Sequence, residues 1–218
     1  MAIAVPAHKI AYMALPKAGC STVKRMLALI DPDVDLPPRE TWTADTWHAI
    51  YPTARFRPHR WDGFQDYWRF AVVRDPVKRL LSVYTNRVVQ LGDLHNSRRL
   101  RRPEFSHLSR DPDPDFFFLH LDAYYEASSV IKHHVLPCEL FIGPKPFRYD
   151  RVFKTEQIGE LAEELGRRSG KSVDISRENS SEMRLDLDDL QPRTIDAIRP
   201  LLEREYAHLD AYYANPLT

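Results

Sequence analysis

The residues best suited to chemistry lie in the loop Pro16–Thr22, which reads PKAGCST. The loop follows an apolar run at residues 9–15 and precedes a helical pattern, so it is predicted to join a buried strand to a helix. A helix N-terminus favours an anion because its backbone N–H groups and its dipole both attract negative charge. The loop is therefore predicted to bind a phosphate-like group through residues Lys17, Ala18, Gly19, Cys20, Ser21 and Thr22.

This loop differs from the nucleotide-triphosphate P-loop, which requires the pattern GxxxxGK[ST]. Here Lys17 precedes Gly19, and the loop is shorter. A kinase would also need Mg²⁺ ligands and an aspartate after a second buried strand, and no such pattern is evident. A nucleotide-dependent phosphotransferase and a non-catalytic phosphate-binding module are nevertheless kept as alternative functions.

A second candidate site pairs an arginine at a strand end with a serine on the next helix. Arg74 follows the apolar run at residues 69–73, and Ser82 comes eight residues later. Eight residues are a little over two helical turns, so Ser82 is expected to point back toward Arg74. Ligands of open α/β sheets bind at the carboxyl ends of the strands, and a guanidinium with a hydroxyl group is a suitable receiver for phosphate.

Both segments resemble motifs of sulfotransferases that use 3′-phosphoadenosine-5′-phosphosulfate (PAPS). PKAGCST resembles the 5′-phosphosulfate-binding loop, most closely that of the carbohydrate branch, sulfotransferase family 2. Residues 70–84, FAVVRDPVKRLLSVY, resemble the family pattern F-V-R-D-P-x-x-R-L-x-S-x-Y. The resemblance implies a P-loop-like sulfotransferase architecture, with Arg74 and Ser82 holding the 3′-phosphate. It also implies PAPS as cofactor, 3′,5′-adenosine bisphosphate as product, and an acceptor hydroxyl on a carbohydrate or a small alcohol.

Sulfuryl transfer, like phosphoryl transfer, depends on positioning and on stabilising charge between two oxygens in line. Lys17 is the candidate cation that stabilises charge on the oxygen between the sulfur and the leaving phosphate. Histidine suits the general base, which must take the acceptor proton. His59 lies before the Arg74 strand, where several sulfotransferase branches place their catalytic histidine, and His134 begins HVLP, which resembles a family H-x-x-P element. His59 is slightly favoured.

Composition bounds the remaining possibilities. The 218 residues, 43 % apolar and 28 % charged, predict one compact domain over residues 1–218. Acidic and basic residues balance at 31 each, so no global field indicates nucleic acid or an anionic membrane. The run Arg98–Arg102 is either a contact for an acidic glycan or a solvated face, and the aromatic stretch Phe116–Tyr125 either lines an acceptor pocket or belongs to the core.

The sequence predicts no membrane span, no metal site and no disulfide framework. No stretch reaches the ~20 apolar residues of a membrane span, and no CxxC or HExxH pattern indicates a metal. Two cysteines, Cys20 and Cys138, make no disulfide framework, which favours a reducing cytoplasm. The oligomeric state and the identity of the acceptor are left open.

Strands and helices alternate along the predicted chain, which is typical of an α/β domain with a mainly parallel sheet flanked by helices. The expected strands are 9–15, 69–73 and 151–154; the expected helices are 21–30, 44–51, 76–88, 113–135, 156–168 and 192–213. Asn179-Ser180-Ser181 resembles a late family element.

Overall fold

The computed structural model describes residues 2–175 and 183–218. Within these ranges the chain forms two compact units. The first unit contains residues 2–74 and 138–175, and the second contains residues 75–137 and 183–218. The expectation of a single domain over 1–218 stays a prediction, and each unit is described here by itself.

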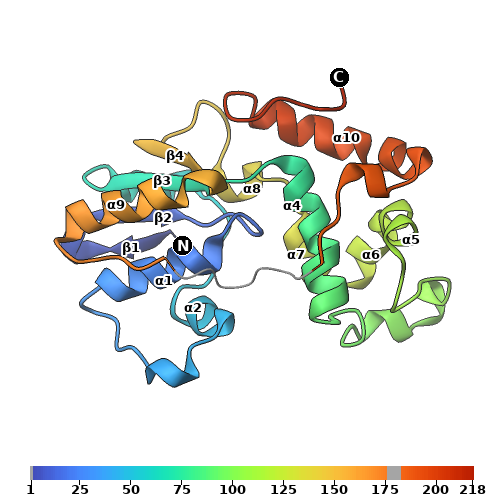
Figure 1. Ribbon diagram of the computed structural model, residues 1–218, viewed down its shortest axis with the longest axis horizontal. Helices are drawn as coiled ribbons and strands as arrows, with labels where there is room; N and C mark the ends of the chain where they lie inside the picture. The colour runs from blue at the N-terminus through green and yellow to red at the C-terminus, as the bar shows by residue number, and fades with distance from the viewer. Residues whose placement is uncertain (1, 176–182) are drawn as a thin grey trace. The chain divides into compact units, whose positions relative to one another are not determined.

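The first unit is built on a sheet of four strands that lie side by side in Figure 1. The strands, in their order across the sheet, are β1 (Ile3–Val5), β2 (Ile10–Met13), β3 (Trp68–Val73) and β4 (Arg151–Lys154). β1 pairs antiparallel with β2, whereas β2, β3 and β4 are parallel. The predicted α/β class with a mainly parallel sheet is therefore confirmed.

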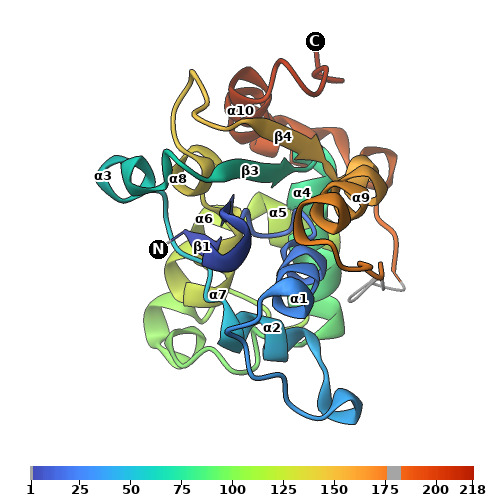
Figure 2. The same ribbon diagram turned by 90° about the vertical axis from the view of Figure 1, so that its left-hand side faces the viewer.

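Helices cover the sheet of the first unit. They are α1 (Cys20–Ile30), α2 (Ala44–Ile50), α3 (Pro58–Trp61), α8 (Glu139–Ile142) and α9 (Ile158–Ser169). α1 and α9 pack on one face, over Tyr12 and Phe70, whose rings stack 4.8 Å apart. Trp61 of α3 packs with Met13 on the opposite face. Figure 2 shows α3 on one side of the sheet and α1 and α9 on the other. Because β2 and β3 are covered on both faces, their sequences are nearly continuous apolar runs.

The second unit is helical. Its helices are α4 (Pro76–Val83), α5 (Pro114–Leu119), α6 (Leu121–Ala127), α7 (Ser129–Val135) and α10 (Pro192–His208). The Asp75 carboxylate caps α4 by accepting the Lys78 N–H at 3.0 Å, as the Asp-Pro pair predicts. α4 continues directly into a π-helical segment, Tyr84–Gln90.

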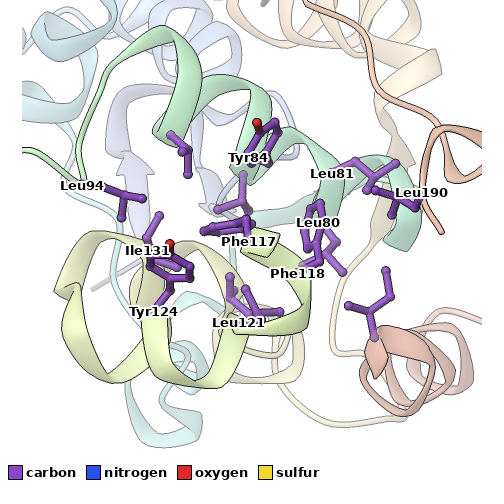
Figure 3. Packing of buried hydrophobic residues seen from close by; sticks show 14 of the residues in the cluster. Leu80, Leu81, Tyr84, Leu94, Phe117, Phe118, Leu121, Tyr124, Ile131 and Leu190 are labelled. Carbon is purple, nitrogen blue, oxygen red and sulfur yellow. The ribbon is translucent and has the colours of Figure 1, made fainter. Parts of the chain in front are cut away.

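Three aromatic side chains of the stretch Phe116–Tyr125 belong to the core of the second unit, whereas Tyr125 is partly exposed and lines a cavity of about 380 Å³. Phe117 and Phe118 of α5 are buried against Tyr84, with ring centroids 5.5 and 6.0 Å away (Figure 3). Tyr124 of α6 is also fully buried, and its hydroxyl donates to the Ser109 carbonyl at 2.6 Å. These aromatic side chains are core residues, and burial of each contributes on the order of 1.5–3 kcal/mol.

A buried ion pair connects α4 to α10 within the second unit. Arg79 Nη1 lies 2.9 Å from Glu205 Oε2, and the two side chains are only 4 % and 3 % exposed. The other terminal nitrogen of Arg79 donates to the carbonyls of Leu136 at 2.7 Å and His134 at 3.3 Å. The second arginine of the RDPVKR segment is thus a structural residue that fixes the end of α7 as well as α10.

Two expectations about elements differ from the structure. The helix expected at 113–135 was wrong as one element, because it is divided into α5, α6 and α7. His120 leaves helical geometry at φ −109° and ψ 23°, and the Ser128 hydroxyl accepts the Ile131 N–H as a new N-cap. β1 was not expected, because three residues before Pro6 are too short to show a strand pattern.

Candidate functional site

The loop between β2 and α1 turns tightly through two left-handed residues. Lys17 has φ 65° and Gly19, the N-cap of α1, has φ 72°. The Ala18 N–H donates to the Leu15 carbonyl at 3.2 Å, and the Gly19 carbonyl accepts the Val23 N–H at 3.1 Å as the first bond of the helix. A left-handed lysine costs about 1–2 kcal/mol, so the fold maintains a strained backbone at the residue expected to carry charge.

The start of α1 is electropositive. Its first turn contains no acidic residue, and helices leave the N–H groups of that turn to be satisfied from outside the helix. Arg74, which follows β3, donates from Nη1 to the Lys17 carbonyl at 3.1 Å. The structure therefore brings Lys17, the loop and Arg74 together in the first unit, in an arrangement able to bind an anion.

Gly19 also lies close to the segment after β4. A side chain there would meet Ile158 Cδ1 at 3.7 Å and Thr155 Cγ2 at 3.9 Å, which are ordinary contact distances. The positive φ of Gly19, rather than lack of space, thus explains why glycine suits this position. The loop between β4 and α9 is therefore a neighbour of the candidate site.

Two polar side chains behind the loop, His48 and Lys24, form a hydrogen-bonded chain with Ser21 that sequence reasoning missed. Ser21 Oγ lies 2.9 Å from His48 Nε2, and His48 Nδ1 lies 2.9 Å from Lys24 Nζ. Lys24 also donates to Thr53 Oγ1 at 2.7 Å. His48 was one of nine histidines in the sequence, and only the packing of α2 against α1 distinguishes it.

The remaining predicted site residues are placed separately. His59 is an exposed residue of α3 in the first unit. Ser82 and His134 belong to the second unit: Ser82 Oγ donates to the Arg79 carbonyl at 2.7 Å, and His134 Nδ1 bonds the Val130 carbonyl at 2.7 Å. The carbonyl partner places a proton on Nδ1 of His134. The roles assigned to these three residues stay predictions.

Other predictions concern residues beyond the loop and the α2 histidine. Asn179-Ser180-Ser181 lies outside the described residues. Arg98 and Arg99 line a cavity of about 380 Å³ in the second unit. No cluster of three or more His, Cys, Asp or Glu side chains suited to a metal ion occurs in residues 2–175 and 183–218. Cys20 and Cys138 are both buried and are not joined by a disulfide.

Comparison with known protein families decides the classification. A family model described as the sulfotransferase family matches residues 1–206. The chain belongs to the sulfotransferase family. The resemblance to sulfotransferase family 2, inferred from two segments, is thereby confirmed over most of the chain. No curated protein and no solved structure matches it.

As a member of this family the protein is a transferase with sulfotransfer activity. The match includes the loop Pro16–Thr22, Arg74, Ser82 and both histidines proposed as bases. None of the helices in the described parts of the chain combines the length and the hydropathy needed to cross a membrane.

Proposed function

We propose that this sulfotransferase takes PAPS as donor and transfers its sulfuryl group to an acceptor hydroxyl, on a carbohydrate. The observation that carries the proposal is the hydrogen bond from Arg74 to the Lys17 carbonyl. It joins the two segments that resemble donor-binding motifs, so that a strand-end guanidinium and a helix-start loop face one anionic ligand. A ligand with phosphates at both ends of an adenosine suits such an arrangement.

Each end of the donor has its own residues in this proposal. The backbone N–H groups of the first turn of α1, with the Ser21 and Thr22 hydroxyls, bind the 5′-phosphate. The Arg74 guanidinium binds the 3′-phosphate as a charged fork. The motif assigns Ser82 to the same phosphate.

When bound, PAPS supplies the activated sulfuryl group. The bond between sulfur and the bridging phosphate oxygen breaks, and a new bond forms between sulfur and the acceptor oxygen. Lys17 stabilises the charge that develops on the bridging oxygen in this proposal. His59 or His134 takes the proton that the acceptor hydroxyl loses, and 3′,5′-adenosine bisphosphate leaves.

Ligand preference separates this proposal from its alternatives. Thermal stabilisation by 3′,5′-adenosine bisphosphate, compared with that by ATP and Mg²⁺, distinguishes a sulfotransferase from a kinase because only bound ligand stabilises the folded state. We expect the bisphosphate to stabilise more strongly, and a preference for ATP would overturn the proposal.

Catalysis requires a second assay. Transfer of labelled sulfate from PAPS is measured with a set of carbohydrate acceptors and with small alcohols and phenols. We expect a carbohydrate hydroxyl to be labelled. Bisphosphate binding without transfer to any hydroxyl would instead favour the non-catalytic phosphate-binding module.

A further inference from the structure

Lys24 is a buried cation in an unusual setting. It lies one turn into α1, its side chain is inaccessible to solvent, and burial lowers its pKa while nearby Cys20 opposes this shift. Within the described residues its partners are His48 Nδ1 at 2.9 Å and Thr53 Oγ1 at 2.7 Å, with no carboxylate in an ion pair. Because an unpaired buried charge is costly, a lysine kept here indicates a role that uses its charge.

The bond to Lys24 fixes the tautomer of His48. An ammonium group has three donors and no acceptor, so His48 Nδ1 must accept and the ring proton must be on Nε2. Nε2 lies 2.9 Å from Ser21 Oγ and therefore donates to that oxygen. The Ser21 hydroxyl hydrogen is consequently directed away from His48.

This direction of donation is opposite to that in a serine–histidine–carboxylate triad. In a triad the carboxylate accepts from Nδ1, which leaves Nε2 free to take the serine proton. Here Nδ1 accepts from the Lys24 ammonium, so Nε2 carries the ring proton and has no lone pair to take the serine proton. His48 therefore does not activate Ser21 as a nucleophile.

The helix that carries His48 is held firmly against α1. Thr43 and Thr46 form a capping box at the start of α2, and at its end the Tyr51 hydroxyl donates to Asp31 Oδ2 at 2.6 Å. Asp31 is the residue that ends α1, so α2 is pinned to α1 near both Ser21 and Asp31. Because both helices are fixed in this way, the hydrogen bonds from Lys24 to His48 and from His48 to Ser21 keep the same direction.

We propose that Lys24 and His48 are positioning residues that hold the Ser21 hydroxyl as a hydrogen-bond donor to the 5′-phosphate of the sulfuryl donor. This inference rests on the proposed function, because it takes the loop at Ser21 as the phosphate-binding loop. The buried charge of Lys24 polarises His48, and His48 in turn polarises Ser21, so each bond in the chain strengthens the next. A negative phosphate at Ser21 also compensates the cation that the fold has buried.

A double-mutant cycle on the affinity for 3′,5′-adenosine bisphosphate tests whether His48 acts through Ser21. Loss of a hydrogen bond to a charged group predicts that Ser21→Ala weakens binding by about tenfold or more. We expect His48→Phe to weaken binding by a similar factor and to have no further effect in the Ser21→Ala background. We expect His48→Gln to recover much of the affinity, because its amide supplies both a donor and an acceptor.

A matched control is available in His8, whose Nε2 lies 3.1 Å from the Ile30 carbonyl at the other end of α1. His8→Gln should bind the bisphosphate like the wild type. Additive losses for Ser21→Ala and His48→Phe would overturn the inference and leave the proposed function intact. A wild-type protein that does not bind the bisphosphate would overturn both.

The tautomer supplies a second readout that needs no ligand. In ¹⁵N NMR of the imidazole nitrogens, the His48 signal, identified by its absence in His48→Gln, should show a protonated Nε2 and an unprotonated Nδ1. The same measurement on Lys24→Met should show loss of this single preferred tautomer. A proton on Nδ1 of wild-type His48 would refute the positioning role even if the bisphosphate binds.

Discussion

The ion pair between Arg79 and Glu205 gives a quantitative test of how α4 is held to α10 within the second unit. Removing one partner of a buried pair costs about 3–5 kcal/mol, because the other charge remains buried without compensation. In Glu205→Leu the guanidinium retains two carbonyl acceptors, so we expect a loss of stability near the lower end, about 3 kcal/mol. In Arg79→Met the Glu205 carboxylate and the Leu136 carbonyl both lose the hydrogen bond from Arg79, so we expect a loss of stability larger than in Glu205→Leu by roughly 1–3 kcal/mol.

The double variant Arg79→Met/Glu205→Leu decides between charge and packing. Replacing both partners with apolar residues of similar volume is often close to neutral, so the double variant should be more stable than Arg79→Met alone. Urea unfolding followed by far-UV circular dichroism measures all three free energies, with m-values checked for constancy. Losses below about 1 kcal/mol for both single variants, the range of surface pairs, would refute the reasoning.

The matched control for this cycle lies on the same helix. Asp196 of α10 pairs with Arg199 at 3.0 Å in an exposed position, where a pair contributes only about 0.2–1 kcal/mol. Asp196→Asn should therefore leave the unfolding midpoint almost unchanged. If this control lost as much stability as Glu205→Leu, burial would not explain the result.

Other predictions concern the site itself. Arg74→Ala should abolish measurable binding of 3′,5′-adenosine bisphosphate in calorimetry, since the 3′-phosphate loses its charged partner; unchanged binding would remove Arg74 from the site. Changing His59 or His134 to Ala should leave that binding intact, while one of the two changes abolishes sulfate transfer; full activity of both variants would place the base elsewhere. Gly19→Ala should destabilise the protein by about 1–2 kcal/mol in urea unfolding because of its left-handed backbone, and an unaffected midpoint would contradict this assignment.

The elements that could be predicted from the sequence have local signals. β2 and β3 are short apolar runs, and Asp75-Pro76 both caps and starts α4, so neighbouring residues alone determine these structures. The break between α6 and α7 is different, because it depends on a backbone change at Ser128 within an otherwise helical pattern. A single serine does not distinguish a new N-cap from a helix interior without its tertiary contacts.

The candidate site was predictable in its loop and in Arg74, but not in the residues behind the loop. His48 is 27 residues from Ser21 and 24 from Lys24, so no local pattern relates them. Lys24 adjoins the apolar positions of α1, and an amphipathic pattern gives no sign that its ammonium is buried. The left-handed backbone of Lys17 was equally hidden, because lysine rarely adopts it.

The shortness of β1 has a consequence for the behaviour of the protein at high concentration. The chain has no net charge at pH 7, so electrostatic repulsion between copies is weak near neutral pH. An exposed strand edge would then be a hazard, because its unpaired backbone groups can template intermolecular sheets. β1 has only three residues and is followed directly by Pro6, which lacks an N–H group, so this edge offers little for another strand to extend. At the β1 edge of the sheet, the short first strand thus limits intermolecular pairing at the pH where the chain has the least net charge.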